Sequence, residues 1–274
     1  GEGYFNAGGV PAVMKELLDN NKLVSKALTV SGKTVKENLI NVNCKDRKVI
    51  YSYSKPLKEN AGFLVLQSNF FDTAIMKMSV VSKEFKERYL SDEKKPMEFT
   101  VRAIVFDGPE HYHNEINNPE LKIDENCILM IRGCGPIGYP GAAEVVNMQP
   151  PDYLLKKGIT SLPCLGDGRQ SGTSESPSIL NVSPEAAAGG GLAIIKNNDL
   201  IKVDLNNKRV DLILDDSEIK SRFNELKFDY PSNQTPWQEL AREYTGQLGE
   251  GACLDLKEKY INVAESKGIP RDNH

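Results

Sequence analysis

The sequence lacks a paired-cysteine pattern. Its 274 residues contain five cysteines, an odd number, and no two of them have the spacing C-x-x-C. This argues against a disulfide framework and against a zinc ribbon. We therefore expect a reducing compartment, the cytoplasm first, with the mitochondrion left open.

Long apolar runs and blocks of like charge are also missing. The most apolar stretches, "GFLVL" (62–66) and "GLAII" (191–195), have the length of strands, whereas a membrane helix needs about 20 residues. The formal charge of −4 arises from 34 basic and 38 acidic residues that are interspersed along the chain. No region therefore attracts a phosphate backbone through a bulk field. Neither a membrane nor a nucleic acid is an expected partner.

Helical patterns open the chain. Apolar residues recur at helical spacing behind Pro11, which predicts a helix over about 10–20. Ser31 and Gly32 indicate the entry to a second helix that carries "KTVKENLINV" (33–42).

Beyond Pro56 the pattern changes to short β-rich runs bounded by Gly, Pro, Asn or charged residues, which predicts a sheet or barrel of short strands. Alternation on both sides of Asn206 predicts a hairpin over 199–214. Helical patterns then follow at 215–226, 235–248 and 255–268, the second with a cap at Thr235. The β-rich runs are "GFLVLQS" (62–68), "AIMKMSVV" (74–81), "FTVRAIVF" (99–106) and "CILMIRG" (127–133).

Two glycine-rich loops hold the residues best suited to chemistry. They are "RGCGPIGYPGAAEVVNM" (132–148) and "GDGRQSGTSESPS" (166–178), and each lies where a strand pattern ends. Glycine lets the main chain approach a ligand closely, so Glu144 or Ser171 among glycines has the make-up of a metal or anion site. A pair of tight turns is the alternative. Neither loop has the spacing of a P-loop or of a dinucleotide fingerprint, which disfavours nucleotide binding by those routes.

Two further candidates have weaker support. His111 and His113 could be paired metal ligands, but alternate spacing beside acids at an expected helix start favours a solvated face. Cys134 could be a thiolate nucleophile, but no His or Lys close to it in the sequence would activate it. A packing role is the better interpretation.

Several long motifs follow one another over nearly the whole chain. They are "AGGVPAVMKELL", "LTVSGKTVKENL", "NFFDTAIMKMSVV", "GYPGAAEVVNM", "LGDGRQSGTSESPSILNVSPEAAAGGGLAII" and "GIPRDNH". In this order they resemble the dihydroxy-acid and sugar-acid dehydratase family of iron–sulfur hydro-lyases. Within "GRQSGTSESPSILN" the sequence is closer to the branch acting on sugar acids, such as pentonates, than to the branch acting on branched-chain amino-acid precursors.

The resemblance implies an α+β fold and a piece of a longer protein. Residues 1–54 would be the helical end of an N-terminal α/β domain. Residues 55–274 would be a C-terminal β-barrel of the swivelling β/β/α type with flanking helices. The chain opens on Gly1, close to an amphipathic helix and with no signal pattern ahead of it, which fits such a piece.

The reaction that the resemblance implies converts a sugar acid, a 2,3-dihydroxy acid, to a 2-keto-3-deoxy acid. In the family a base removes the C2 proton while Mg²⁺ holds the carboxylate and the 2-hydroxyl, and a cluster iron acts as Lewis acid on the departing 3-hydroxyl. By resemblance Ser171 is the base, and Thr173 orients it or binds the substrate. Glu144 would be a Mg²⁺ ligand. His274, in the tail "PRDNH", would donate a proton to the leaving hydroxyl.

The implied cofactors of the complete enzyme are Mg²⁺ and a [2Fe-2S] or [4Fe-4S] cluster. The family's cluster cysteines and its remaining Mg²⁺ ligands, which are acids and a modified lysine, lie in the N-terminal domain. None of the five cysteines here falls at a cluster position, so no cluster is expected in this chain.

The expected partners are a small-molecule sugar acid, the N-terminal domain and, in the complete protein, further copies of the same chain. Alone, the chain is expected to be inactive. A second hypothesis is a non-catalytic β-barrel, derived from the same family, that binds a partner or a small acid. An upstream domain with three cluster cysteines in the same gene would favour the first hypothesis.

Overall fold

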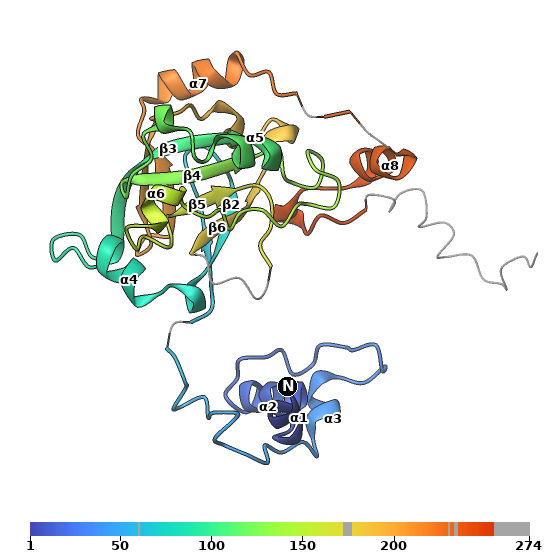
Figure 1. The fold of residues 1–274 in the computed structure, drawn as a ribbon. Helices are drawn as coiled ribbons and strands as arrows, with labels where there is room; N and C mark the ends of the chain where they lie inside the picture. Colours follow the sequence, from blue (N-terminus) through green and yellow to red (C-terminus); the bar gives the residue numbers. More distant parts are fainter. Residues whose placement is uncertain (60, 172–176, 230, 233–234, 255–274) are drawn as a thin grey trace, which may run out of the picture. The chain divides into compact units, whose positions relative to one another are not determined.

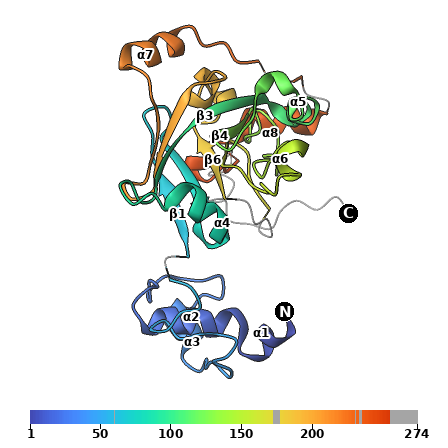
Figure 2. The same ribbon diagram turned by 60° about the vertical axis from the view of Figure 1, so that its left-hand side comes forward.

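The structure, a computed structural model, describes residues 1–59, 61–171, 177–229, 231–232 and 235–254 (Figures 1 and 2). It divides into two compact units, Gly1–Ala61 and Gly62–His274. The expected helix at 255–268 lies outside the described residues, as do Thr173 and His274. None of the described helices is long and apolar enough to cross a lipid bilayer.

The first unit is helical and has a small core of its own, made by Ala7, Ala12 and Ile50. The predicted helix at 10–20 is confirmed, with Pro11 in its first turn. Its helices are α1 (Glu2–Asn6), α2 (Gly9–Asp19) and α3 (Val35–Leu39). The identity of residues 1–54 as the end of an α/β domain stays a prediction.

The predicted second helix exists but begins later than Ser31 and Gly32. Thr34 caps α3: its hydroxyl accepts from the N–H of Glu37 at 3.2 Å, and the Glu37 carboxylate accepts from the N–H of Thr34 at 2.7 Å. This reciprocal capping box satisfies two N–H groups of the first turn. The Ser31 hydroxyl instead bonds the hydroxyl of Thr29.

The second unit is built on one mixed sheet in the order β1-β2-β6-β5-β4-β3-β7-β8. Strands β3, β4, β5 and β6 are parallel to one another, and the remaining pairs are antiparallel. The strands are β1 (Phe63–Leu66), β2 (Thr73–Lys77), β3 (Glu98–Asp107), β4 (Cys127–Arg132), β5 (Cys164–Gly166), β6 (Ser178–Ser183), β7 (Leu200–Asp204) and β8 (Arg209–Leu212).

The two edge strands meet and nearly close the sheet. Gln67, just after β1, donates its N–H to Lys208 O at 3.0 Å and accepts from the N–H of Val210 at 2.9 Å. The Asn69 side chain exchanges two further bonds with the main chain of Leu212, at 2.8 and 2.9 Å. The predicted β-barrel with flanking helices is confirmed.

Buried side chains lie on both faces of the parallel strands. In β4, Ile128 and Met130 join the larger core, whereas Leu129 and Ile131 join a second core with Phe106. Successive residues of a strand point to opposite faces, so a continuous apolar run fits a strand that is covered on both sides. Each such side chain contributes about 1.5–3 kcal/mol when it is removed from water.

Short helices flank the barrel, with α7 toward one end and α4 toward the other in Figures 1 and 2. The predicted cap at Thr235 is confirmed, because its hydroxyl accepts from the N–H of Gln238. The helices are α4 (Lys83–Phe85), α5 (Gly108–Glu115), α6 (Asp152–Leu155), α7 (Asp216–Asn224) and α8 (Pro236–Tyr244). A π-helical turn (Lys86–Leu90) and five 3-10 turns (Met78–Val80, Pro119–Leu121, Ala186–Ala188, Gly191–Ile194 and Leu248–Glu250) complete the described elements.

Candidate functional site

The carboxyl ends of the four parallel strands each carry a charged residue. Asp107 ends β3, Arg132 ends β4, Asp167 follows β5, and Glu185 comes two residues after β6. Ligands of parallel sheets bind at this edge, because the loops that leave the strands gather there. Each glycine-rich loop begins where a strand ends, as the sequence predicted, and the structure places both of these strand ends at this edge.

The two glycine-rich loops lie against each other. Arg169 donates its N–H to Ala143 O at 2.9 Å and its Nε–H to Ala142 O at 2.8 Å. A side chain at Gly168 would place its Cβ only 2.7 Å from Ala143 O and 3.0 Å from Cβ of Cys134. Glycine is therefore required at position 168 for this close approach.

Glu144 forms an ion pair with Arg169, through Arg169 Nη1 and Glu144 Oε1. The Glu144 side chain is 44% exposed and that of Arg169 is 51% exposed, so solvent reaches the pair. Ser171 follows two residues later and is partly exposed. The structure thus brings Glu144 against the segment that leads into Ser171, whereas Thr173 and His274 lie outside the described residues.

Asp167 is fully buried, and its carboxylate accepts hydrogen bonds from three main-chain N–H groups. Its Oδ1 accepts from Cys134 at 2.9 Å, and its Oδ2 accepts from Gly133 at 3.0 Å and from Ala186 at 2.9 Å. Burial raises the pKa of Asp167 to about 6, although the N–H bonds act in the opposite direction. The nearby Glu185 carboxylate adds to the rise in the pKa of Asp167.

Glu185 is also fully buried, inside the loop that follows β4. Its carboxylate accepts from the N–H groups of Ile137 and Gly138, both at 2.9 Å, and from Gln247 Nε2 at 3.0 Å. A Cβ at Gly135 would lie 2.5 Å from Glu185 Oε2, so the loop wraps closely around the carboxylate. Neither Asp167 nor Glu185 was among the site residues predicted from the sequence. The one signal for Asp167 was an acid between two glycines directly after a short apolar run.

The other sequence candidates have ordinary structural roles. Cys134 is fully buried, which confirms its packing role, and burial raises the pKa of its thiol well above the usual range. His111 lies on α5, where its Nδ1 accepts from the N–H of Asp107 at 2.9 Å. Among the described residues, no three His, Cys, Asp or Glu side chains gather as a metal-binding group.

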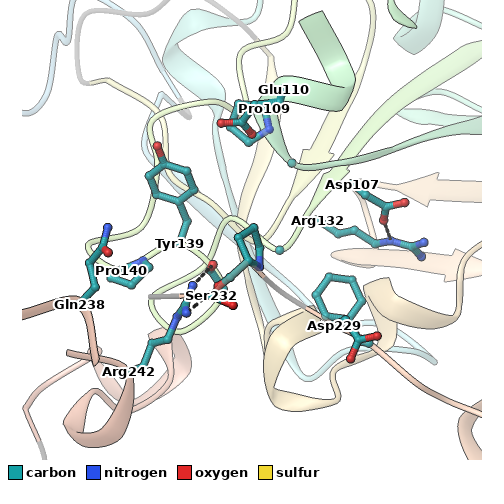
Figure 3. Close-up of a pocket in the computed structure, with 15 residues that line it drawn as sticks. Asp107, Pro109, Glu110, Arg132, Tyr139, Pro140, Asp229, Ser232, Gln238 and Arg242 are labelled. Carbon is teal, nitrogen blue, oxygen red and sulfur yellow. Dashed lines mark hydrogen bonds and ion pairs between the residues drawn. The ribbon is translucent and has the colours of Figure 1, made fainter. Parts of the chain in front are cut away.

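A pocket of about 190 Å³ opens between the end of β3, the end of β4 and α8 (Figure 3). Arg132 there pairs with Asp107 at 2.6 Å, and Arg242 reaches from α8 to the carbonyls of Ile137 at 2.8 Å and Gly138 at 3.1 Å. Both guanidinium groups are therefore already paired with other groups of the protein. Gly133, Gly138 and Tyr139 of the first glycine-rich loop line this pocket, but neither Ser171 nor Glu144 is among the described residues that do. The contact between the two loops is therefore the stronger candidate site.

The second unit is thus an α+β domain, a nearly closed barrel whose two glycine-rich loops contact each other at the carboxyl ends of its parallel strands. Residues 48–252 match the family described as dihydroxy-acid/6-phosphogluconate dehydratase, C-terminal. The chain belongs to this family.

Several curated relatives are similar along the chain. It is 54% identical over 274 residues to a D-xylonate dehydratase of Caulobacter vibrioides, covering 100% of this chain and 46% of the relative. It is 35% identical to an L-arabinonate dehydratase of Rhizobium leguminosarum bv. trifolii, with 100% and 45% covered. A dihydroxy-acid dehydratase of Acetivibrio thermocellus is 35% identical, with 92% and 43% covered. The chain thus spans a little under half the length of these relatives.

Proposed function

We propose that this chain is the C-terminal part of a hydro-lyase that converts a sugar acid to a 2-keto-3-deoxy acid. Two of the relatives are named for five-carbon aldonates, D-xylonate and L-arabinonate. We therefore propose a five-carbon aldonate as the substrate. The remaining half of the active site would come from an N-terminal domain, and the complete protein would be a homo-oligomer.

The observation that carries this proposal is the contact between the two motif loops. Arg169 bonds the carbonyls of Ala142 and Ala143 through its side chain and its main chain, and it pairs with Glu144. The Glu144 carboxylate and the serine loop therefore share one edge of the barrel. This arrangement supports Glu144 as a Mg²⁺ ligand and Ser171 as the base.

The dehydration requires a proton to leave C2 and a hydroxyl to leave C3. Ser171 Oγ would take the C2 proton, so that the C2–H electron pair forms the C2=C3 bond as the C3–O bond breaks and water is released. The resulting enol then becomes the 2-keto acid. A serine alkoxide is a strong enough base only where cationic or N–H donors stabilise it, and a glycine-lined loop can present such donors. By the family resemblance, Thr173 would orient Ser171 and His274 would protonate the leaving hydroxyl.

Glu144 fits one position of a Mg²⁺ site, because it offers a solvent-reached carboxylate oxygen to a hard cation. When bound, Mg²⁺ would hold the substrate carboxylate and 2-hydroxyl and polarise them. The described residues do not gather the cysteines that a cluster needs. We propose that the cluster ligands and the other Mg²⁺ ligands lie in the part of the complete protein that precedes this chain.

The test is turnover of D-xylonate and L-arabinonate by the complete enzyme, measured as 2-keto-3-deoxy acid formed. Ser171→Ala should lower kcat by at least roughly a hundredfold, the low end for losing a positioned base. Ser161→Ala is the matched control, because Ser161 is also partly exposed and lies in the connection that leads into β5. Turnover of Ser171→Ala within about twofold of wild type would contradict the base assignment. No turnover of either aldonate by the intact protein would favour the non-catalytic barrel.

A further inference from the structure

Burying the carboxylate of Asp167 costs free energy, and the proposed reaction does not use this carboxylate directly. Removing a carboxylate from water is costly unless its oxygens are well bonded. Among the described residues, Asp167 forms no ion pair, and its carboxylate accepts hydrogen bonds from three main-chain N–H groups. An apolar side chain of similar size would avoid burying a charge but would leave these three N–H groups without an acceptor.

The partners of Asp167 come from both sides of its strand. Gly133 and Cys134 follow β4, whereas Ala186 begins the 3-10 turn after β6. Strand β5 lies between β4 and β6 in the sheet. One carboxylate, directly after β5, is therefore hydrogen-bonded to the segments that follow β4 and β6, so it links the carboxyl ends of three neighbouring parallel strands.

The segment that leads to Ser171 starts directly from this junction. Gly168, the next residue, packs against Cys134 and accepts at its carbonyl from the N–H of Asn181 on β6, at 2.9 Å. Arg169 then bonds Ala142 and Ala143. The path of residues 168–171 thus depends on where the loop after β4 is held.

We propose that Asp167 is a positioning residue. By accepting hydrogen bonds from three N–H groups of the loops after β4 and β6, it fixes the path of the segment 168–171 and so orients Ser171. The proposal rests on the proposed function, because it assigns Asp167 an effect on catalysis through Ser171. Asp167 itself does not touch the substrate.

The first arm of the test measures amide hydrogen exchange in this chain, which needs no substrate. Asp167→Asn keeps the size of the side chain but replaces one acceptor oxygen with an NH₂ donor that faces N–H groups. Exchange at Gly133, Cys134, Ala186 and residues 168–171 should rise at least about tenfold, while amides inside β3 and β4 change little. Leu165→Ala is the matched control, since Leu165 is a fully buried residue of β5, the strand that leads to Asp167, and faces the larger core. It should change exchange through the barrel as a whole.

The second arm measures kinetics in the complete enzyme. Asp167→Asn should lower kcat at least about tenfold and leave KM within about threefold, because the bound substrate meets a misplaced base. In a Ser171→Ala background the same substitution should have almost no further effect, since two residues that act through one group are not additive. If Asp167→Asn does not fold, Ala186→Pro takes its place as the test variant. It removes one of the three N–H donors at the first residue of a 3-10 turn, where proline is accommodated.

The outcomes separate the two proposals. An active wild type, an inactive Ser171→Ala and an Asp167→Asn that matches Leu165→Ala in exchange and kcat would overturn the role of Asp167 alone. Full turnover by Ser171→Ala would overturn the role of Ser171 as the base. It would also overturn the role of Asp167 in orienting Ser171, whatever the exchange data show. Local loss of protection together with a kcat effect that vanishes in the Ser171→Ala background would establish the positioning role.

Discussion

The raised pKa of Asp167 predicts how the stability of the barrel changes with pH. Burial raises the pKa from 3.8 to about 6, so the folded chain binds a proton at this carboxyl more tightly than the unfolded chain does. The stabilisation from this group is complete below about pH 4 and is lost as the pH rises through about 6. A shift of about two units, at about 1.4 kcal/mol per unit, corresponds to roughly 3 kcal/mol.

The perturbation that isolates this effect is Asp167→Asn, which cannot ionise. Relative to wild type, the free energy of unfolding of the variant should rise by up to roughly 3 kcal/mol between pH 4 and pH 7.5. Groups whose pKa is lowered, such as Asp204 beside Asn207, act with the opposite sign but are present in both proteins and cancel. The unit Gly1–Ala61 is also common to both.

The assay is urea unfolding followed by circular dichroism at half-unit steps of pH, with the difference between the two proteins plotted against pH. Asp72→Asn replaces the same chemical group at an exposed position and serves as the control. A difference for Asp167→Asn that stays constant within about 0.5 kcal/mol across the range would refute the reasoning. The expected result also has a functional meaning: the ionised carboxylate lowers stability while it holds the loops, as strained or buried groups at active sites do.

Three further outcomes are expected. Glu144→Gln should weaken Mg²⁺ binding by the complete enzyme, because a neutral amide replaces an anionic oxygen, and an unchanged titration midpoint would make Glu144 a turn residue. Deleting His274 should lower kcat and leave Mg²⁺ affinity intact, which turnover from pH 6 to 9 at saturating metal would test. Arg242→Ala removes bonds to the carbonyls of Ile137, Gly138 and Pro231. It should loosen α8 locally by about 2 kcal/mol, seen as lower fluorescence anisotropy of the single tryptophan, Trp237, with no comparable fall in melting temperature.

Elements with a local signal were predictable from the sequence. The continuous apolar run of β4, the alternation in the β7–β8 hairpin and the capped start of α8 all appear near the expected residues. β5 and β6 were not predicted. β5 has only three residues, and β6 follows a serine-rich run, so each becomes a strand through its pairing with neighbours rather than through its own pattern.

The candidate site divides in the same way. The motif resemblance pointed to Glu144 and Ser171, and the structure adds that Arg169 joins their loops. Apart from the two glycines that flank Asp167, nothing local in the sequence indicated the roles of Asp167 and Glu185. Asp167 meets N–H groups 33 and 34 residues earlier in the chain, and Glu185 meets others 47 and 48 residues earlier. Such contacts exist only once the parallel strands are side by side.

The seam between β1 and β8 determines when the barrel can be completed. Its bonds join Asn69 to Leu212, 143 residues later in the chain, so closure must await almost the whole barrel sequence, and long-range pairings of this kind form slowly. Strands β3 to β6 lie between these ends and can pair earlier, which would assemble the loops of Glu144 and Ser171 on a sheet that is still open. Until Gln67 reaches Lys208 and Val210, both edges offer unpaired N–H and C=O groups to other chains. During synthesis, the barrel therefore keeps two edges open to pairing with other chains until residue 212 has left the ribosome.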